Sequence, residues 1–242
     1  MSAASDKFEQ DVAKNINKFP GIKATRPKVS TEYSDVLIEY GGKKYWVEVK
    51  MSHTDNLSNP RVYYEKGKWK TTYKTPAAKH TVDILNKSKQ AKDFIKAISK
   101  FSGIPEKEIS IPTTKSGLKQ PGAVPLHVMK LFFDQPNINR YIANEENYNL
   151  GDVVTEHYTI GKAEPAYYMQ AGDDFYMISK KNPLGIKGIP VLSGTGDFKV
   201  RVATRSEFYE VQAEIKIKKM PNSKFSVAPK TTKENPFMNM KK

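Results

Sequence analysis

The chain has 242 residues, 38% of them hydrophobic and 27% charged, and a mean hydropathy of -0.63, values typical of a globular protein of one or two domains. No apolar run approaches the roughly 20 residues that a membrane-spanning helix needs, and the first residues, MSAASDKFEQD, do not resemble a secretory signal. The chain has no cysteine, which excludes disulfides, thiolate zinc sites and cysteine nucleophiles. We therefore expect an intracellular, cytoplasmic protein that has no membrane partner.

The formal net charge of +14 favours a polyanionic partner. Most of the excess lies in two blocks: residues 60–100 hold 11 basic and 3 acidic side chains, and residues 215–242 hold 8 and 1. The rest of the chain is close to neutral. Because charge runs also occur on ordinary solvated surfaces, the charge alone favours nucleic-acid binding without establishing it.

The first 50 residues are predicted to form a helix followed by a β-hairpin. Apolar residues at helical spacing predict an amphipathic helix over residues 6–18. Residues 35–40 and 45–51 are rich in β-branched and aromatic side chains, and Gly41-Gly42 between them is a tight-turn signal. Two paired strands are therefore expected here.

The following segment predicts a second hairpin and one or two helices. Residues 61–74 (RVYYEKGKWKTTYK) mix aromatic and basic side chains around Lys66-Gly67, which favours a more exposed hairpin. Residues 77–101 fit one long helix or two short ones. Residues 103–125 are rich in Pro, Gly, Ser and Thr, so they predict a linker or long loop between two subdomains.

The second half of the chain has the pattern of an antiparallel sheet. Short alternating runs separated by turn residues predict a β-rich region over residues 126–220. Within residues 208–220 the alternation predicts an ordinary solvent-facing side of a strand, formed by Glu210, Gln212, Lys216 and Lys218, and the Glu214-Ile-Lys216 tripeptide lies on this strand. Residues 221–242 have little periodicity and excess lysine, so they predict a basic, flexible tail.

Three side chains of the first hairpin form a candidate site. Asp35 opens the first strand, while Glu48 and Lys50 are two residues apart on the second strand and point to one face. Paired carboxylates favour a hard divalent cation such as Mg²⁺ or Mn²⁺, and a lysine beside such a metal can orient a water molecule and offset charge on a phosphate. The alternative is a surface hairpin with a cross-strand ion pair.

The spacing Ser34-Asp35, twelve residues, then Glu48-Val49-Lys50 resembles the motif of the PD-(D/E)XK nuclease superfamily. The resemblance covers about residues 5–100 and implies an α/β restriction-endonuclease-like core of helix, β-hairpin and helix. Ser34 stands where the motif has proline. An insertion of about 25 residues separates the hairpin from the next helix.

The resemblance also implies the roles of the site residues. Asp35, Glu48 and the Val49 carbonyl would hold Mg²⁺ or Mn²⁺, and Lys50 would position the attacking water. In several branches the first helix supplies one more metal-site glutamate, and Glu9 is the matching position here. Type II restriction enzymes with this core often act as dimers, so a homodimer is a possible assembly.

The tripeptide (D/E)-x-K does not by itself identify the site, because it occurs three times. The other two copies are Asp197-Phe-Lys199 and Glu214-Ile-Lys216. The copy at residues 48–50 is favoured because only this one has an aspartate at a hairpin-compatible distance, a preceding helix and a following basic helix.

The candidate DNA-binding residues are basic or aromatic and follow the candidate site in the sequence; they are Arg61, Tyr63, Tyr64, Lys68, Trp69, Lys70, Lys74, Lys89 and Lys92. Basic side chains can neutralise phosphates, and exposed aromatic rings can stack on bases. The alternative is a hairpin whose aromatic rings pack inward and whose lysines are merely solvated.

These observations predict a Mg²⁺-dependent DNA endonuclease with its core in residues 1–102, including a basic aromatic insertion near residues 54–80. The linker would span residues 103–125, and the β-rich region of residues 126–220 would help to grip DNA. The main alternative is a non-catalytic basic nucleic-acid-binding protein, in which the Asp35, Glu48 and Lys50 cluster is accidental.

Overall fold

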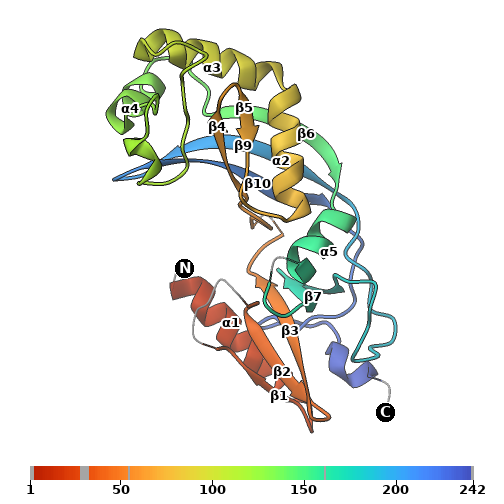
Figure 1. The fold of residues 1–242 in the computed structure, drawn as a ribbon. Coiled ribbons are helices and arrows are strands. Elements are labelled where there is room, and N and C mark those ends of the chain that lie inside the picture. Colours follow the sequence, from red (N-terminus) through yellow and green to blue (C-terminus); the bar gives the residue numbers. More distant parts are fainter. Residues whose placement is uncertain (1–2, 28–32, 54, 161, 241–242) are drawn as a thin grey trace. The chain divides into compact units, whose positions relative to one another are not determined.

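A computed structural model describes residues 3–27, 33–53, 55–160 and 162–240 (Figure 1). The described residues form a mixed α/β protein with two five-stranded sheets and five α-helices. The chain divides into two compact units. Unit 1 comprises Met1–Leu57, Asn149–Gly196 and Lys216–Lys242, and unit 2 comprises Ser58–Tyr148 and Asp197–Ile215. This division differs from the consecutive segments expected from the sequence, because each unit is assembled from separate stretches of the chain.

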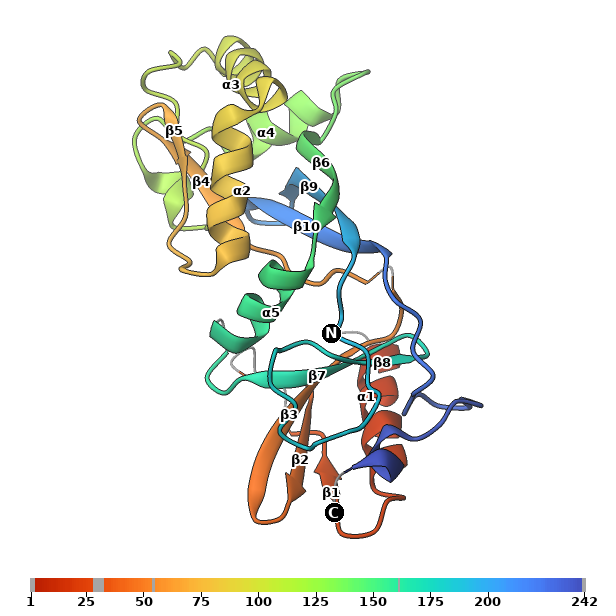
Figure 2. The same ribbon diagram turned by 90° about the vertical axis from the view of Figure 1, so that its right-hand side faces the viewer.

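Unit 1 contains the first sheet, in the strand order β1-β2-β3-β7-β8. Its strands are β1 (Lys23–Thr25), β2 (Val36–Tyr40), β3 (Lys43–Lys50), β7 (Ala166–Ala171) and β8 (Asp174–Met177). Its helices are α1 (Ala3–Ile16), α5 (Gly151–Ile160) and the short 3-10 helix η2 (Pro236–Asn239). Figure 2 shows α1 alongside the strands of this sheet.

The predicted N-terminal helix and hairpin are confirmed. Val12 and Ile16 of α1 are fully buried in the core of unit 1, as the helical spacing of apolar residues requires. Strands β2 and β3 are antiparallel, and their register runs from Val36 opposite Val47 to Tyr40 opposite Lys43. Gly41 and Gly42 both have positive φ, a conformation that glycine adopts without steric cost, so the turn between the strands needs these residues.

Strand β3 pairs with β7 in parallel, although the strands are more than a hundred residues apart in the sequence. A parallel pair cannot be joined by a tight turn and needs a long crossover connection, usually with a helix. Here the chain passes through most of unit 2 and returns in α5, which contacts β7. The helix that follows the hairpin within unit 1 is therefore α5, and the helices expected at residues 77–101 belong to unit 2 instead.

Unit 2 contains most of the second sheet, in the strand order β5-β4-β10-β9-β6. Its strands are β4 (Arg61–Glu65), β5 (Lys68–Lys70), β6 (Tyr141–Asn149), β9 (Thr195–Thr204) and β10 (Tyr209–Lys219). Its helices are α2 (Pro76–Lys87), α3 (Lys89–Ser102), α4 (Leu126–Phe133) and the short 3-10 helix η1 (Gly117–Lys119). Strands β4 and β5 confirm the predicted hairpin around Lys66-Gly67.

The segment predicted as one or two helices forms two, and Ser88 separates them. Its extended backbone ends α2, and its hydroxyl accepts a hydrogen bond from the Ala91 N–H at 3.2 Å to begin α3. Helix α3 then ends at Gly103, which has φ 73°. Buried Phe94, Ile95 and Ile98 pack toward the core, so the lysines between them face outward.

Of the two alternatives predicted for residues 103–125, the structure shows the long loop and not the linker. Ile109, Ile111 and Val124 are buried, and the backbone of Ile111 exchanges two hydrogen bonds with Tyr64 of β4, at 3.0 and 2.9 Å. The segment is a packed loop inside unit 2. The Gly, Pro and Ser content that suggested a linker supplies the turns of this loop.

Residues 208–220 form the predicted strand, β10, and Lys216 and Lys218 are exposed as expected, but the polar side chains before them do not face solvent. Glu210, Gln212 and Glu214 are buried. Glutamate carboxylates are tolerated there because arginines from neighbouring segments pair with them. Between residues 126 and 220 the chain also forms α4 and α5, which the β-rich prediction missed.

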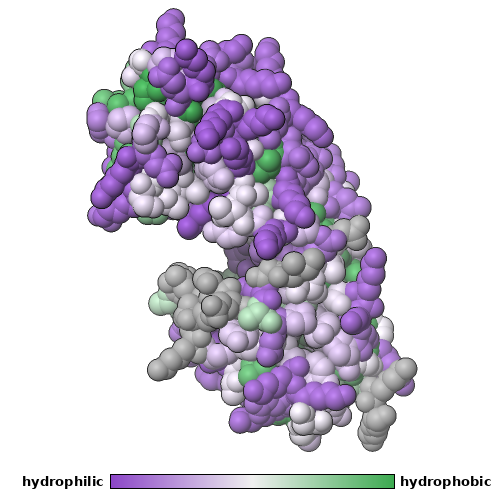
Figure 3. Space-filling view, in the orientation of Figure 1, coloured by the Kyte–Doolittle hydropathy of each residue, from purple (hydrophilic) through white to green (hydrophobic). Residues whose placement is uncertain are grey.

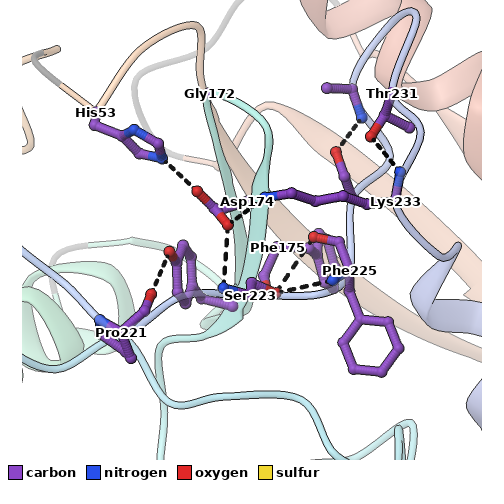
Figure 4. Close-up of polar contacts among 12 residues, drawn as sticks. His53, Gly172, Asp174, Phe175, Pro221, Ser223, Phe225, Thr231 and Lys233 are labelled. Atoms are coloured by element: carbon purple, nitrogen blue, oxygen red, sulfur yellow. Dashed lines mark hydrogen bonds and ion pairs between the residues drawn. The ribbon is translucent and has the colours of Figure 1, made fainter.

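The C-terminal segment is packed rather than flexible, contrary to the prediction. Phe225, Val227 and Phe237 are buried in the core of unit 1. Figure 4 shows that the segment is also held by Asp174 of β8, which accepts a hydrogen bond from the Ser223 N–H at 3.1 Å and pairs with Lys233 at 2.7 Å. Residues 241–242 of the predicted tail, and residue 54 of the predicted insertion, lie outside the described residues.

The face of the molecule that is seen in the orientation of Figure 1 is largely polar. Figure 3 shows hydrophilic side chains over much of the face that it presents, including the region of α2 and α3. None of the helices in the described ranges is long and apolar enough to cross a membrane.

Candidate active site

The structure brings together three of the predicted site residues at one end of the β2/β3 pair, within unit 1. Since Val36 lies opposite Val47, the next residues outward, Asp35 and Glu48, are directed to one face. The Val49 N–H donates a hydrogen bond to Asp35 Oδ2 at 2.8 Å. Lys50 Nζ lies 2.6 Å from Glu48 Oε1.

Asp35 is held in an environment that disfavours its charge. Burial and the neighbouring Glu48 carboxylate raise the pKa of Asp35 to about 7, although Lys50 and the Val49 N–H oppose the shift. At neutral pH a proton therefore occupies this carboxyl group for a large part of the time. The site has more carboxylate than its own cations neutralise.

Glu48 and Lys50 form a charged pair inside the protein. Burial alone would raise the pKa of Glu48, but Lys50, Lys162 and the Ser34 hydroxyl outweigh it and hold this pKa below its ordinary value. Burial likewise disfavours the Lys50 ammonium, but Glu48 outweighs it and raises the pKa of Lys50. Both groups are therefore ionised at neutral pH, and Lys50 is positively charged.

Glu9 lies in α1 as predicted, but it does not present a free carboxylate. Arg26 Nε donates to Glu9 Oε2 at 2.8 Å, and the Ser5 hydroxyl donates to Oε1 at 3.0 Å. The charge of Glu9 still contributes to the raised pKa of Asp35, so the two residues lie close enough to interact. The structure gives Glu9 a supporting position rather than the open position of a metal ligand.

Two residues of α5, His157 and Tyr158, complete the surroundings of Lys50 and were not predicted. The buried Tyr158 donates a hydrogen bond to the Leu57 carbonyl at 2.6 Å, and its ring centroid lies 6.0 Å from Lys50 Nζ. Burial lowers the pKa of His157 to about 4, so its imidazole is neutral at pH 7. The sequence contains no signal for these neighbours, because they reach Lys50 only through the parallel β3/β7 crossover.

The groups at this site fit a hard cation that retains several waters. Glu48 Oε2 is buried and accepts no hydrogen bond from any described residue. Because the Val49 N–H points to Asp35, the carbonyl of the same residue faces the same edge of the strand. Within the described ranges, no three His, Cys, Asp or Glu side chains are grouped to hold a metal. The site thus offers two carboxylates and one carbonyl, without a full protein cage.

The predicted DNA-binding residues lie in unit 2, and their environments differ. Trp69 is only 3% exposed and its ring packs at 5.2 Å from that of Tyr64, so the predicted base-stacking role of Trp69 is wrong. A large ring opposite Tyr64 on the inner face of the hairpin is instead part of the core. Tyr63 lies on the other face and is half-buried.

The basic candidates divide into paired and exposed side chains. Arg61 forms an ion pair with Glu210 at 2.8 Å, and Lys70 pairs with Glu65 at 3.0 Å. The remaining candidates are exposed; they are Lys68, Lys74, Lys89 and Lys92. Lys96 and Lys100 continue the exposed row of Lys92 along α3.

Comparison with known proteins does not identify a family. No protein-family model matches the chain, and no curated protein matches it. Among solved structures, a chain described as HhaI endonuclease in complex with DNA matches with a TM-score of 0.28 and 13% identity, over 91% of this chain and 88% of that chain. Similarity at this level does not establish a common fold.

Proposed function

We propose that the protein is a Mg²⁺- or Mn²⁺-dependent DNA endonuclease of the PD-(D/E)XK type, with its active site at Asp35, Glu48 and Lys50. The observation that carries this proposal is the placement of the Asp35 carboxyl group beside the buried Glu48 carboxylate, at the end of paired strands and next to Lys50. Burial and Glu48 raise the pKa of Asp35, as this geometry requires. Lys50 already neutralises Glu48, so Asp35 is left without a cation of its own. Strongly perturbed carboxyl groups of this kind concentrate at functional sites.

A purely structural role explains this arrangement less well. A buried ion pair is often no more stable than apolar residues of the same volume, and an additional buried carboxylate adds a further desolvation cost. A divalent cation would neutralise the excess charge and would also give the buried Glu48 Oε2 a partner. Binding of the cation would offset the unfavourable free energy of burying the second carboxylate.

Each residue has a distinct part in the proposed reaction. Asp35, Glu48 Oε2 and the Val49 carbonyl would hold the cation. Such an ion supplies Lewis-acid activation of a phosphate and lowers the pKa of bound water. Lys50, fixed by Glu48 and backed by the Tyr158 ring, would orient the attacking water and offset charge that develops on the phosphate.

DNA is the proposed substrate because of the charge of the chain. The net charge of +14 and the exposed lysines of α3 suit a polyanion with regularly spaced phosphates. A non-catalytic DNA-binding protein would share those lysines. Only the nuclease also accounts for the two coupled carboxylates in unit 1.

The test is to incubate the protein with supercoiled plasmid, linear duplex and branched DNA, with Mg²⁺, Mn²⁺, Ca²⁺ or excess EDTA. We expect cleavage with Mg²⁺ or Mn²⁺ and binding without efficient cleavage in Ca²⁺. Cleavage that persists in excess EDTA would overturn the metal assignment. Binding without cleavage of any substrate would favour the non-catalytic alternative.

A further inference from the structure

One face of the second sheet carries arginines that are fixed by buried glutamates. Glu210 of β10 is 1% exposed and pairs with two arginines. Arg61 Nε lies 2.8 Å from Glu210 Oε2, and Arg205 Nε donates to Glu210 Oε1 at 2.9 Å. The side chains of Arg61 and Arg205 are 44% and 47% exposed, respectively. Each guanidinium is therefore held by Glu210 and is still accessible to solvent.

A second buried glutamate, Glu214, holds a third arginine on the same face. Arg201 Nε of β9 lies 2.6 Å from Glu214 Oε1, and the Tyr141 hydroxyl donates to Glu214 Oε2 at 3.3 Å. Glu210 and Glu214 are four residues apart on β10, so their side chains share a face, and β4 and β9 flank that strand. Three guanidinium groups therefore line one side of the sheet within unit 2.

The contacts leave a defined edge of each guanidinium available. A guanidinium has five N–H donors. Glu210 accepts hydrogen bonds from Nε and Nη2 of Arg205, whereas Arg61 and Arg201 are held by ion pairs whose closest contact to the carboxylate is through Nε. Among the described residues, the Nη groups of Arg61 and Arg201 donate no hydrogen bond beyond these ion pairs. A planar guanidinium with a fixed orientation can donate two parallel hydrogen bonds to a group that has two acceptor atoms, oxygen or nitrogen, side by side.

The glutamates decide which acceptor is suitable. A carboxylate beneath a guanidinium cancels part of its charge and repels an approaching phosphate, so this arrangement is poor for gripping a DNA backbone. It fixes the plane of the guanidinium, however, and the O6/N7 edge of guanine is an uncharged acceptor pair that arginine binds in a bidentate manner. The exposed lysines Lys92, Lys96 and Lys100 have no such partners and suit phosphates.

We propose that Arg61, Arg201 and Arg205 read guanine edges in the major groove of duplex DNA, with Glu210 and Glu214 as positioning residues. The proposal rests on DNA being the substrate of the proposed nuclease, and it adds sequence preference to that function. Discrimination between DNA sequences would come from the fixed arginines.

The test is a binding selection in EDTA, in which the protein selects from short duplexes of random sequence. We expect the selected duplexes to share guanines at fixed positions. Replacing one such guanine with 7-deazaguanine, which lacks the N7 acceptor, should weaken binding about tenfold, within the range for one bidentate contact. The Arg201→Lys or Arg205→Lys variant should already lack the contact to one guanine. Replacing that guanine with 7-deazaguanine should therefore not weaken the binding of the variant any further.

Two controls separate recognition from folding and from phosphate binding. Arg140→Lys changes an arginine of unit 2 that packs on the Phe133 ring and donates to Thr204, so it should retain the wild-type preference. Lys96→Ala should weaken binding to every duplex and flatten its salt dependence. Thermal melts identify any variant that fails to fold, and the 7-deazaguanine effect on the wild-type protein needs no variant at all.

Selection without any shared guanine, or variants that keep the full 7-deazaguanine effect, would overturn the guanine assignment. These outcomes differ from failure of the nuclease proposal. A protein that cleaves DNA in Mg²⁺ but shows no guanine preference retains the proposed function and loses this inference. A protein that selects guanine-containing duplexes but cleaves none retains the inference about recognition and loses the nuclease.

Discussion

The carboxyl group of Asp35 lies just outside β2, where it accepts a hydrogen bond from the Val49 N–H and interacts with Glu48. Its raised pKa has a consequence for stability in the absence of metal. The folded protein binds a proton up to about pH 7, whereas an aspartate in an unfolded chain releases it near pH 4. Between these values the folded state holds the extra proton, so stability falls as pH rises.

We therefore predict that the free energy of unfolding in EDTA decreases between pH 4 and pH 7, by at most about 1.4 kcal/mol per pH unit from this group. Asp35→Asn should remove this contribution, because the amide does not titrate. The measurement is denaturant unfolding of both proteins at several pH values. An identical slope in the wild-type protein and Asp35→Asn would show that burial of this carboxyl group does not have the cost assigned to it.

The site residues that could be predicted from the sequence lie close to one another along the chain. Asp35, Glu48 and Lys50 lie on one hairpin, and the turn at Gly41-Gly42 fixes which residues face each other. His157 and Tyr158 could not be found in this way, because they approach Lys50 through a crossover that passes through unit 2. Glu9 was placed on the correct helix, but the pattern gave no sign of its partner Arg26.

At the scale of single elements, the β4/β5 hairpin has an inner and an outer face. Trp69 is on the inner face, so Trp69→Ala should cost about 3–5 kcal/mol of stability by leaving a cavity in the core. Tyr73, which follows the hairpin, is 48% exposed, and Tyr73→Ala should change stability by no more than about 0.5 kcal/mol. Chemical denaturation of both variants is the measurement. A stable Trp69→Ala with reduced DNA affinity would restore the stacking role that the structure argues against.

The C-terminal segment gives a second comparison, between two neighbouring residues of η2. Phe237 is fully buried in the core of unit 1, so Phe237→Ala should lose about 3–5 kcal/mol. Met238 is 70% exposed, and Met238→Ala should be close to neutral. Thermal or urea melts distinguish the two. If both variants are as stable as the wild-type protein, the segment does not pack as described.

Elements were predicted well where a local signal marks their ends and poorly where burial depends on distant partners. Ser88 and Gly103 mark the boundaries of α3 in the sequence itself. The alternation in β10 predicts the strand, but it wrongly places Glu210 in solvent because the arginine partners of Glu210 and Glu214 lie on other segments. An ion pair across strands leaves no periodic trace in a single strand.

At the scale of the whole molecule, the chain leaves unit 1 and returns to it twice. The two basic blocks begin near two of these passages, at residues 60 and 215, but a change of charge does not show that the chain returns to an earlier unit. The predicted consecutive domains therefore do not match the two units. The residues of the two proposed functions lie in different units: the carboxylate cluster is in unit 1, and the exposed lysines and fixed arginines are in unit 2. Chemistry and recognition should therefore be separable by substitution.

The central claim is that the coupled carboxylates of unit 1 carry out metal-dependent cleavage. Its most direct test is plasmid cleavage in Mg²⁺ by the wild-type protein, Glu48→Gln and Glu39→Gln. Glu48→Gln removes the charge of the buried carboxylate and preserves its shape, whereas Glu39 lies on β2 of the same sheet with its side chain 41% exposed. We predict that Glu48→Gln remains folded and loses cleavage, while Glu39→Gln cleaves like the wild-type protein. A folded Glu48→Gln that cleaves at the wild-type rate would contradict the claim.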